Sequence, residues 1–205
     1  MSRTQELVML ERRRLLRATL AGGVLAALGG VTFMPRLFAS DHGAAPPTTP
    51  GQPQEITLQC FADDGRALGP CQVKRLVLSE AEWRRRLSPT AYYVMREDGT
   101  ERAFSGDHEK PGRPGLFRCP GCATALFDAA TEFDSGTGWP SFWQPIAASN
   151  VIEKRDSTFG MVRTEIRCAG CDSHLGHVFD DGPRPTGLRY CMNSVALRFV
   201  PRTSA

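Results

Sequence analysis

The sequence predicts a mainly β fold in which two small antiparallel sheets follow short N-terminal helices. Twenty glycines and fifteen prolines in 205 residues indicate many turns, which favour short strands over long helices. From Gly112 onward, short apolar runs alternate with turn residues, as in a β domain. Two Cys-x-x-Cys pairs, well separated along the chain, have the spacing of a zinc site that joins two turns. The predicted fold is therefore stapled by zinc.

Length and charge limit the organisation and the partners. At roughly 150 residues per domain, the chain holds one domain with appendages. The net charge is only +3, and no block of Lys and Arg is interleaved with aromatic residues, so a nucleic-acid partner has no support. We expect three parts: a signal or membrane anchor at 1–40, a linker or N-terminal extension at 41–75, and the folded domain at 76–200.

The first forty residues have the features of an export signal. Arginines at 12–14 precede an apolar stretch from Ala18 to Met34, as in twin-arginine signals. That stretch is close to the lower limit for crossing a membrane, roughly 17 residues. Cleavage near Ala39 and retention as an anchor both remain open, whereas a buried core helix is disfavoured by the arginines. We expect an exported, periplasmic protein, either soluble or anchored to the inner membrane.

The next segments range from a linker to two helices. Residues 41–54 are rich in Pro, Thr, Gly and Ala, as linkers are. Residues 56–73 have no clear pattern, although they contain a turn signal at 63–65 and two cysteines. Ser79-Glu-Ala-Glu82 is a capping box that predicts a helix start, and Ser88-Pro89 predicts a second helix ending near Gly99.

Short strands are expected at 115–119, 125–127, 161–166 and 188–200. Side chains alternate along a strand, so Arg189, Cys191 and Asn193 share one face of the last one. If residues 175–181 are also extended, His177 and Asp181 fall together on one face.

The zinc ligands are expected to be four thiolates: Cys119, Cys122, Cys168 and Cys171. Four thiolates give a closed tetrahedral site with no open position, which is structural rather than catalytic. Two disulfides are the alternative, and iron is a second candidate metal. We favour a metal over disulfides because a glycine precedes the second cysteine of each pair, as in metal knuckles, and zinc is the default metal for such a site. Once four thiolates are counted, the histidines are not needed as ligands.

Cys191 is then a separate thiol with polar neighbours. The guanidinium of Arg189 favours the thiolate, which is the reactive form of cysteine. His177 and Asp181 can supply a proton donor or orient a water. A buried, inert cysteine is the alternative. In the aromatic loop at 138–143, we expect Trp139 at a pocket rim that accepts a small apolar group such as a methyl.

Several long motifs resemble one family. The runs at 133–142, 174–183 and 189–194 closely resemble the B-type peptide-methionine (R)-S-oxide reductases, and both Cys-x-x-Cys pairs fall where the zinc-binding members have them. The resemblance extends over about 76–199. It implies the methionine-R-sulfoxide reductase fold, structural Zn²⁺, and repair of methionine oxidised under oxidative stress, whether free or in proteins.

The resemblance also implies roles for the site residues. Cys191 would attack the sulfoxide sulfur and become a sulfenic acid. His177 and His174 would bind or protonate the sulfoxide oxygen through water, with Asp181 orienting them. Arg189 would activate the thiolate. Asn193 would hold the substrate or the loop, and Trp139 would receive the substrate methyl.

Recycling is where the sequence departs from the family. Many members carry a resolving cysteine at the position of Thr137, and some at that of Ser105. Cys60 and Cys71 remain, and three possibilities stay open: a structural disulfide, resolution of Cys191 by one of them, or direct reduction by a thioredoxin-like protein. A rival function is a zinc-stabilised β module that binds peptides without catalysis, but such a module does not require Cys191.

Overall fold

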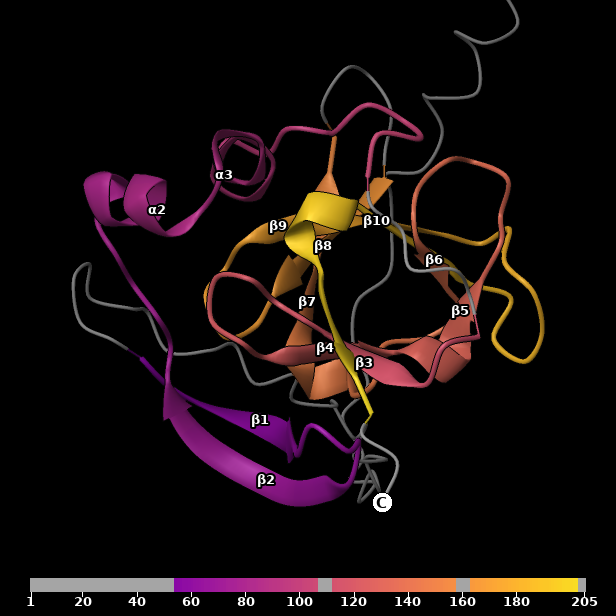
Figure 1. Cartoon of the computed structure of the whole chain (residues 1–205), viewed down its shortest axis with the longest axis horizontal. Coiled ribbons are helices and arrows are strands. Elements are labelled where there is room, and N and C mark those ends of the chain that lie inside the picture. The colour runs from indigo at the N-terminus through magenta and orange to yellow at the C-terminus, as the bar shows by residue number, and fades with distance from the viewer. Residues whose placement is uncertain (1–53, 107–111, 158–162, 203–205) are drawn as a thin grey trace, which may run out of the picture. The chain divides into compact units, whose positions relative to one another are not determined.

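The computed structural model describes residues 54–106, 112–157 and 163–202. These residues are mainly β, as predicted, with antiparallel strands and two α-helices (Figure 1). The expected export signal at 1–40 lies outside the described residues, so it stays a prediction. No helix within the described residues is long and apolar enough to span a bilayer.

An N-terminal hairpin occupies the segment in which the sequence showed no clear pattern. Strand β1 (Glu55–Phe61) pairs antiparallel with β2 (Ala67–Lys74). The turn lies at the predicted signal, where Gly65 donates its N–H to the carbonyl of Ala62. Gly65 has a φ of 86°, a conformation that glycine adopts without steric cost. This hairpin is a separate two-stranded sheet.

The two predicted helices are confirmed. They are α2 (Glu80–Arg86) and α3 (Pro89–Arg96). Ser79 and Glu82 form the complete capping box at the start of α2, and the Ser88 side chain caps α3. Trp83 of α2 and Met95 of α3 are buried in the core.

Two further sheets carry the domain. The six-stranded sheet has the order β5 (Glu132–Phe133), β6 (Ser141–Phe142), β10 (Arg189–Met192), β9 (His174–Phe179), β8 (Arg163–Cys168), β7 (Val151–Asp156). The three-stranded sheet has the order β11 (Arg198–Pro201), β3 (Gly115–Arg118), β4 (Ala125–Asp128). Every pairing is antiparallel. Short 3₁₀ turns lie at Ala129–Thr131 and Ala148–Asn150.

The expectation of one strand over 188–200 is wrong. A 3₁₀ turn at Ser194–Ala196 separates β10 from β11, and the two strands join different sheets. The carboxylate of Glu101 accepts the N–H groups of Ser194 and Val195, at 2.6 and 3.1 Å. These bonds satisfy the first N–H groups of the turn, which a continuous strand would have paired within a sheet.

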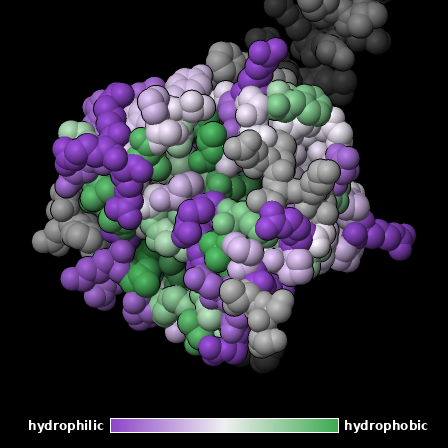
Figure 2. Space-filling model, viewed as in Figure 1, coloured by the Kyte–Doolittle hydropathy of each residue, from purple (hydrophilic) through white to green (hydrophobic). Residues whose placement is uncertain are grey.

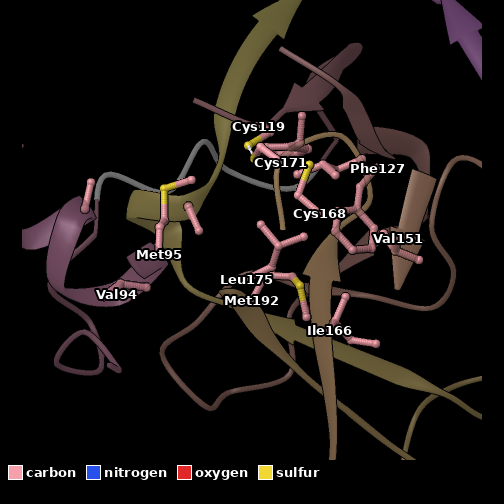
Figure 3. Close-up of a cluster of buried hydrophobic side chains, with 14 of the residues drawn as sticks. Val94, Met95, Cys119, Phe127, Val151, Ile166, Cys168, Cys171, Leu175 and Met192 are labelled. Carbon is pink, nitrogen blue, oxygen red and sulfur yellow. Dashed lines mark hydrogen bonds between the residues drawn. The ribbon is translucent and has the colours of Figure 1, made fainter. Parts of the chain in front are cut away.

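The core lies between these sheets and the helices. The rings of Phe127 and Phe142 stack with their centroids 4.3 Å apart, joining the small sheet to the large one. Figure 3 shows Cys119, Cys168 and Cys171 close together beside Phe127, so the sulfurs border this core. On the face drawn in Figure 2, hydrophobic residues show between hydrophilic side chains.

Candidate active site and metal centre

Two tight turns bring the four predicted zinc ligands together. Cys119 and Cys122 lie in the turn from β3 to β4, and Cys168 and Cys171 in the turn after β8. Each turn contains a residue with positive φ, Ala123 in one and Asp172 in the other.

The sulfur positions fit a tetrahedral metal ion. The sulfurs of Cys119 and Cys171 are 3.6 Å apart, and those of Cys122 and Cys168 are 3.4 Å apart. Four thiolates at about 2.3 Å from a tetrahedral zinc ion are separated by about 3.8 Å. All four sulfurs lie within 4.8 Å of one another, and the cysteines are free thiols rather than two disulfides. The cluster can therefore hold a metal ion in a closed site.

Cys191 lies apart from this cluster, on β10 in the middle of the large sheet. Its register partners are Ser141 on β6 and His177 on β9. The Thr137 hydroxyl lies 4.0 Å from its sulfur. The hydroxyl of Ser135 bridges those of Thr137 and Ser141, at 2.9 and 2.8 Å. Three linked hydroxyls thus border the half-buried thiol.

Arg189 lies on the same strand as Cys191 and is fixed by an acid. Its Nε and Nη2 donate to the two carboxylate oxygens of Asp181, at 2.9 and 2.8 Å. Its guanidinium also covers the ring of Phe179, 4.5 Å from the centroid. The hydrogen bonds from Arg189 lower the pKa of the Asp181 carboxyl. The structure thus gives Asp181 a different task from the expected one, because it holds Arg189 and not the histidines.

The ionisation of Cys191 reflects two opposing effects. Burial raises the pKa of its thiol, while Thr137, Arg189 and Ser141 lower it by hydrogen bonding or charge. Burial is the larger effect, so the net pKa lies above the usual value for cysteine. Arg189 favours the thiolate, as the sequence predicts, but this effect is smaller than the cost of desolvation.

Two histidines on β9 lie near one another, each held by a different acid. The ring centroids of His174 and His177 are 5.4 Å apart. Nδ1 of His174 is 2.7 Å from Glu165, and Nε2 of His177 is 3.2 Å from Asp156. Burial lowers the pKa of His177. Sequence reasoning missed both acids, because nothing in their spacing along the chain points to the histidines.

Glu101, which caps the 3₁₀ turn at Ser194–Ala196, also positions Trp139 and Asn193. Trp139 Nε1 donates to the carbonyl of Glu101 at 3.3 Å, and the Glu101 N–H donates to Asn193 Oδ1 at 3.0 Å. Asn193 Nδ2 donates to the carbonyl of Leu175 at 3.0 Å. The amide of Asn193 therefore holds the loop together, which is one of its two expected roles. Glu101 is a further residue that the sequence did not single out.

Cys60 and Cys71 form a disulfide across the hairpin, with their Cα atoms 5.9 Å apart. Of the three possibilities for these cysteines, the structure has the intramolecular bond between them. Gln59 and Asn150 exchange two hydrogen bonds, each 2.9 Å long, and Arg118 of β3 donates to the Phe61 carbonyl at 2.8 Å; these bonds tie the hairpin to the body of the domain.

Comparison with known proteins identifies the family. The SelR domain model matches residues 87–201, which include the four cysteines, Cys191 and both histidines. The chain belongs to the SelR family. It is 56% identical over 128 residues to the peptide methionine sulfoxide reductase MsrB of Bradyrhizobium diazoefficiens, covering 62% of this chain and 92% of that protein.

Two further SelR relatives give the same picture. The peptide methionine sulfoxide reductase MsrB of Pseudomonas putida is 55% identical over 130 residues, covering 63% of this chain and 99% of the relative. That of Agrobacterium fabrum is 54% identical over 123 residues, covering 60% and 91%. The disulfide hairpin lies upstream of the residues that the SelR model matches.

Proposed function

We propose that this SelR protein reduces the R epimer of methionine sulfoxide to methionine, and so repairs oxidised methionine. The observation that carries the proposal is the setting of Cys191. A thiol on β10 has a fixed guanidinium on its own strand, linked hydroxyls beside it and His177 opposite it on β9, and His174 lies next to that histidine. The relatives named above are all peptide methionine sulfoxide reductases.

The chemistry balances with the groups present. The Cys191 sulfur attacks the sulfoxide sulfur, the S–O bond breaks, and the oxygen passes to Cys191 as a sulfenic acid while methionine leaves. The methionine sulfur gains two electrons and the cysteine sulfur loses two. Oxygen transfer requires that the oxygen be protonated, and we assign to the His174–His177 pair the binding of the water that carries this proton. Trp139 would receive the substrate methyl.

An external dithiol completes the cycle. One thiol attacks the sulfenic acid and releases water, and the second displaces Cys191 as a thiol and leaves the reductant as a disulfide. Thr137 stands where a resolving cysteine would be, and Cys60 and Cys71 are bonded to each other. Both observations favour direct reduction by a thioredoxin-like protein.

The metal of the four-cysteine cluster is proposed to be structural zinc. The four sulfurs leave no open coordination position, and the cluster borders the core rather than Cys191. When bound, zinc would hold the turn between β3 and β4 against the turn after β8. Metal analysis should find one zinc per chain, and stripping it should unfold the domain without first altering Cys191 chemistry.

Export is a further part of the proposal. The hairpin disulfide supports it, because disulfides persist in oxidising compartments such as the periplasm. Mass spectrometry of the mature N-terminus, together with fractionation of cells, tests it. A product that begins at Met1 and remains in the cytoplasm would exclude export.

An epimer assay tests the function directly. Wild-type protein should release methionine from the R sulfoxide and not from the S sulfoxide, with dithiothreitol as the reductant. Cys191→Ser should abolish turnover, whereas Cys60→Ser and Cys71→Ser should retain it. R-specific reduction that persists in Cys191→Ser would refute the assignment.

A further inference from the structure

A chain of hydrogen bonds connects His174 to Glu165 and Arg167 on β8. Arg167 Nη1 donates to Glu165 Oε1 at 2.6 Å, and the same oxygen lies 2.7 Å from His174 Nδ1. Arg167 also donates to Asp98 from Nη1, at 2.8 Å, and to Asp172 from Nε, at 3.1 Å. The side chains of Arg167 and Glu165 are each 9% exposed and that of His174 is 2% exposed, so the bonds among these three residues are shielded from water, whereas Asp98 and Asp172 are exposed.

This cluster is not a metal site. Ligand atoms of Asp98, Glu165 and His174 lie close enough to share an ion. However, Nη1 of Arg167 already contacts both Asp98 and Glu165. The guanidinium is therefore the cation of the cluster. Because an arginine stays protonated in proteins, it fixes the position of the Glu165 carboxylate as a permanent charge would.

The position of Glu165 determines which nitrogen of neutral His174 carries the proton. A carboxylate only accepts hydrogen bonds, so Nδ1 must be the donor. Nε2 is then a lone-pair acceptor. It is buried and has no hydrogen-bond partner among the described residues. A buried polar atom without a hydrogen-bond partner costs free energy. This nitrogen is therefore available to accept a hydrogen bond from a ligand that carries an O–H group.

We propose that Arg167 and Glu165 are positioning residues for His174. They hold the ring and keep neutral His174 in the Nδ1–H tautomer, so that Nε2 accepts a hydrogen bond from the water that carries a proton to the sulfoxide oxygen. The two histidines then differ in role, because His177 turns its Nε2 toward Asp156 instead. This inference rests on the proposed function.

The tautomer is tested on the wild-type full-length protein. Nitrogen-15 NMR of labelled histidine at pH 8.5, assigned with a His174→Asn variant, should show His174 protonated at Nδ1 and bare at Nε2. Protonation at Nε2 alone, or at both nitrogens, would overturn the proposal. This measurement does not depend on turnover. If the protein failed to reduce the R sulfoxide, the proposed function would fall while the tautomer was still decided.

Variants of Glu165 test its effect on catalysis. Glu165→Gln should lower kcat at least tenfold, change KM less than twofold, and mix the two tautomers. Glu165→Asp keeps the charge and should recover most of the tautomer preference and part of the rate. An unchanged kcat in Glu165→Gln, or a lost rate with the wild-type tautomer, would contradict the positioning role.

Lys154 offers a matched control. Its Nζ lies 3.9 Å from Oε2 of Glu165, the oxygen that does not face His174, and its side chain is 62% exposed. Lys154→Gln should keep kcat within twofold of wild type. Because β8 also ends in Cys168, metal content and thermal melting of each variant must match wild type before the rates are compared.

Discussion

The Thr137 hydroxyl lies 4.0 Å from the sulfur of Cys191, close enough for a side chain at this position to meet an oxidised Cys191. The hydroxyl of Ser135 bonds both Thr137 and Ser141, so Thr137 is held within a chain of linked hydroxyls. When Cys191 is oxidised, the side chains beside its sulfur are therefore hydroxyls rather than a second thiol.

Thr137→Cys should convert the enzyme to one that closes an internal disulfide. A sulfur at the position of the Thr137 hydroxyl oxygen would start about 4.0 Å from the Cys191 sulfur, so a rotamer change with a small backbone shift would bring the two sulfurs to bonding distance. After one equivalent of R sulfoxide without reductant, wild type should be labelled by dimedone at Cys191 and the variant should not. Thr137→Ser, which keeps the hydroxyl, should behave as wild type. Full dimedone labelling of Thr137→Cys would contradict the geometry.

Arg189→Met should make Cys191 less reactive at a given pH. Loss of the guanidinium removes an interaction that lowers the thiol pKa, so the pKa should rise further above its usual value. Since only the thiolate reacts, alkylation by iodoacetamide at pH 8 should slow about tenfold. Rates measured from pH 7 to 11 give the pKa directly.

Two further variants check that result. Asp181→Asn should raise the pKa of Cys191 less than Arg189→Met does, because the guanidinium remains but loses its bidentate partner. Arg198→Met removes an exposed arginine from β11, in the other sheet, and should leave the alkylation profile unchanged. Equal slowing in all three variants would point to a loss of folding instead.

Replacing Cys60 and Cys71 with serine should weaken the fold and spare catalysis. The disulfide closes a loop across residues 60–71, worth about 3 kcal/mol in the chain-entropy account. Urea unfolding should show this loss, and wild type pretreated with a reductant should match it. Turnover with dithiothreitol and with a thioredoxin-like protein should both stay within twofold. A loss confined to the thioredoxin-like reductant would show that these cysteines take part in recycling.

Glu132 should make stability depend on pH near neutrality. Burial raises the pKa of its carboxyl to about 7 from 4.5. Between these two pH values the folded protein retains a proton that the unfolded chain loses. The resulting contribution of Glu132 to the free energy of unfolding is complete below about pH 4.5 and is lost as the pH rises through 7. The free energy of unfolding, measured with urea, should fall by about 2 kcal/mol less between pH 5 and pH 8 in Glu132→Gln than in wild type.

An exposed acid serves as the control for Glu132. Glu80→Gln on α2 should leave the pH dependence of stability as it is in wild type, because the Glu80 side chain is 67% exposed. If Glu132→Gln also left it unchanged, the Glu132 carboxyl would not retain its proton in the folded state.

Local signals in the sequence predicted local structure well. The capping box at Ser79, the strand at 115–118 and the cluster of four cysteines depend on residues near one another, or on a strict spacing. Turns and metal knuckles are determined within a few residues, so their residue types reveal them.

Contacts between distant segments could not be predicted in this way. Glu101 reaches Ser194 across 93 positions and ends β10, which is why a single strand over 188–200 was wrongly expected. Glu165 contacts His174 although its register partner on β9 is His177, and the register of β8 against β9 shifts between Ile166 and Arg167. That register depends on the packing of both strands, and no spacing along one strand contains it.

The hairpin determines how a pull on the chain before residue 54 would be transmitted. Such a force would enter β1, which is bonded to β2 by the disulfide, and would pass into the domain through Asn150, through Arg118 and through the bond from the Leu76 N–H to the Gly170 carbonyl. Gly170 belongs to the cysteine turn after β8, so the force reaches the metal centre, while the strand that bears Cys191 lies outside this path. In a protein tethered from its N-terminus, the load would therefore be carried first by the disulfide hairpin and the cysteine turns, which are different segments from the strand that bears Cys191.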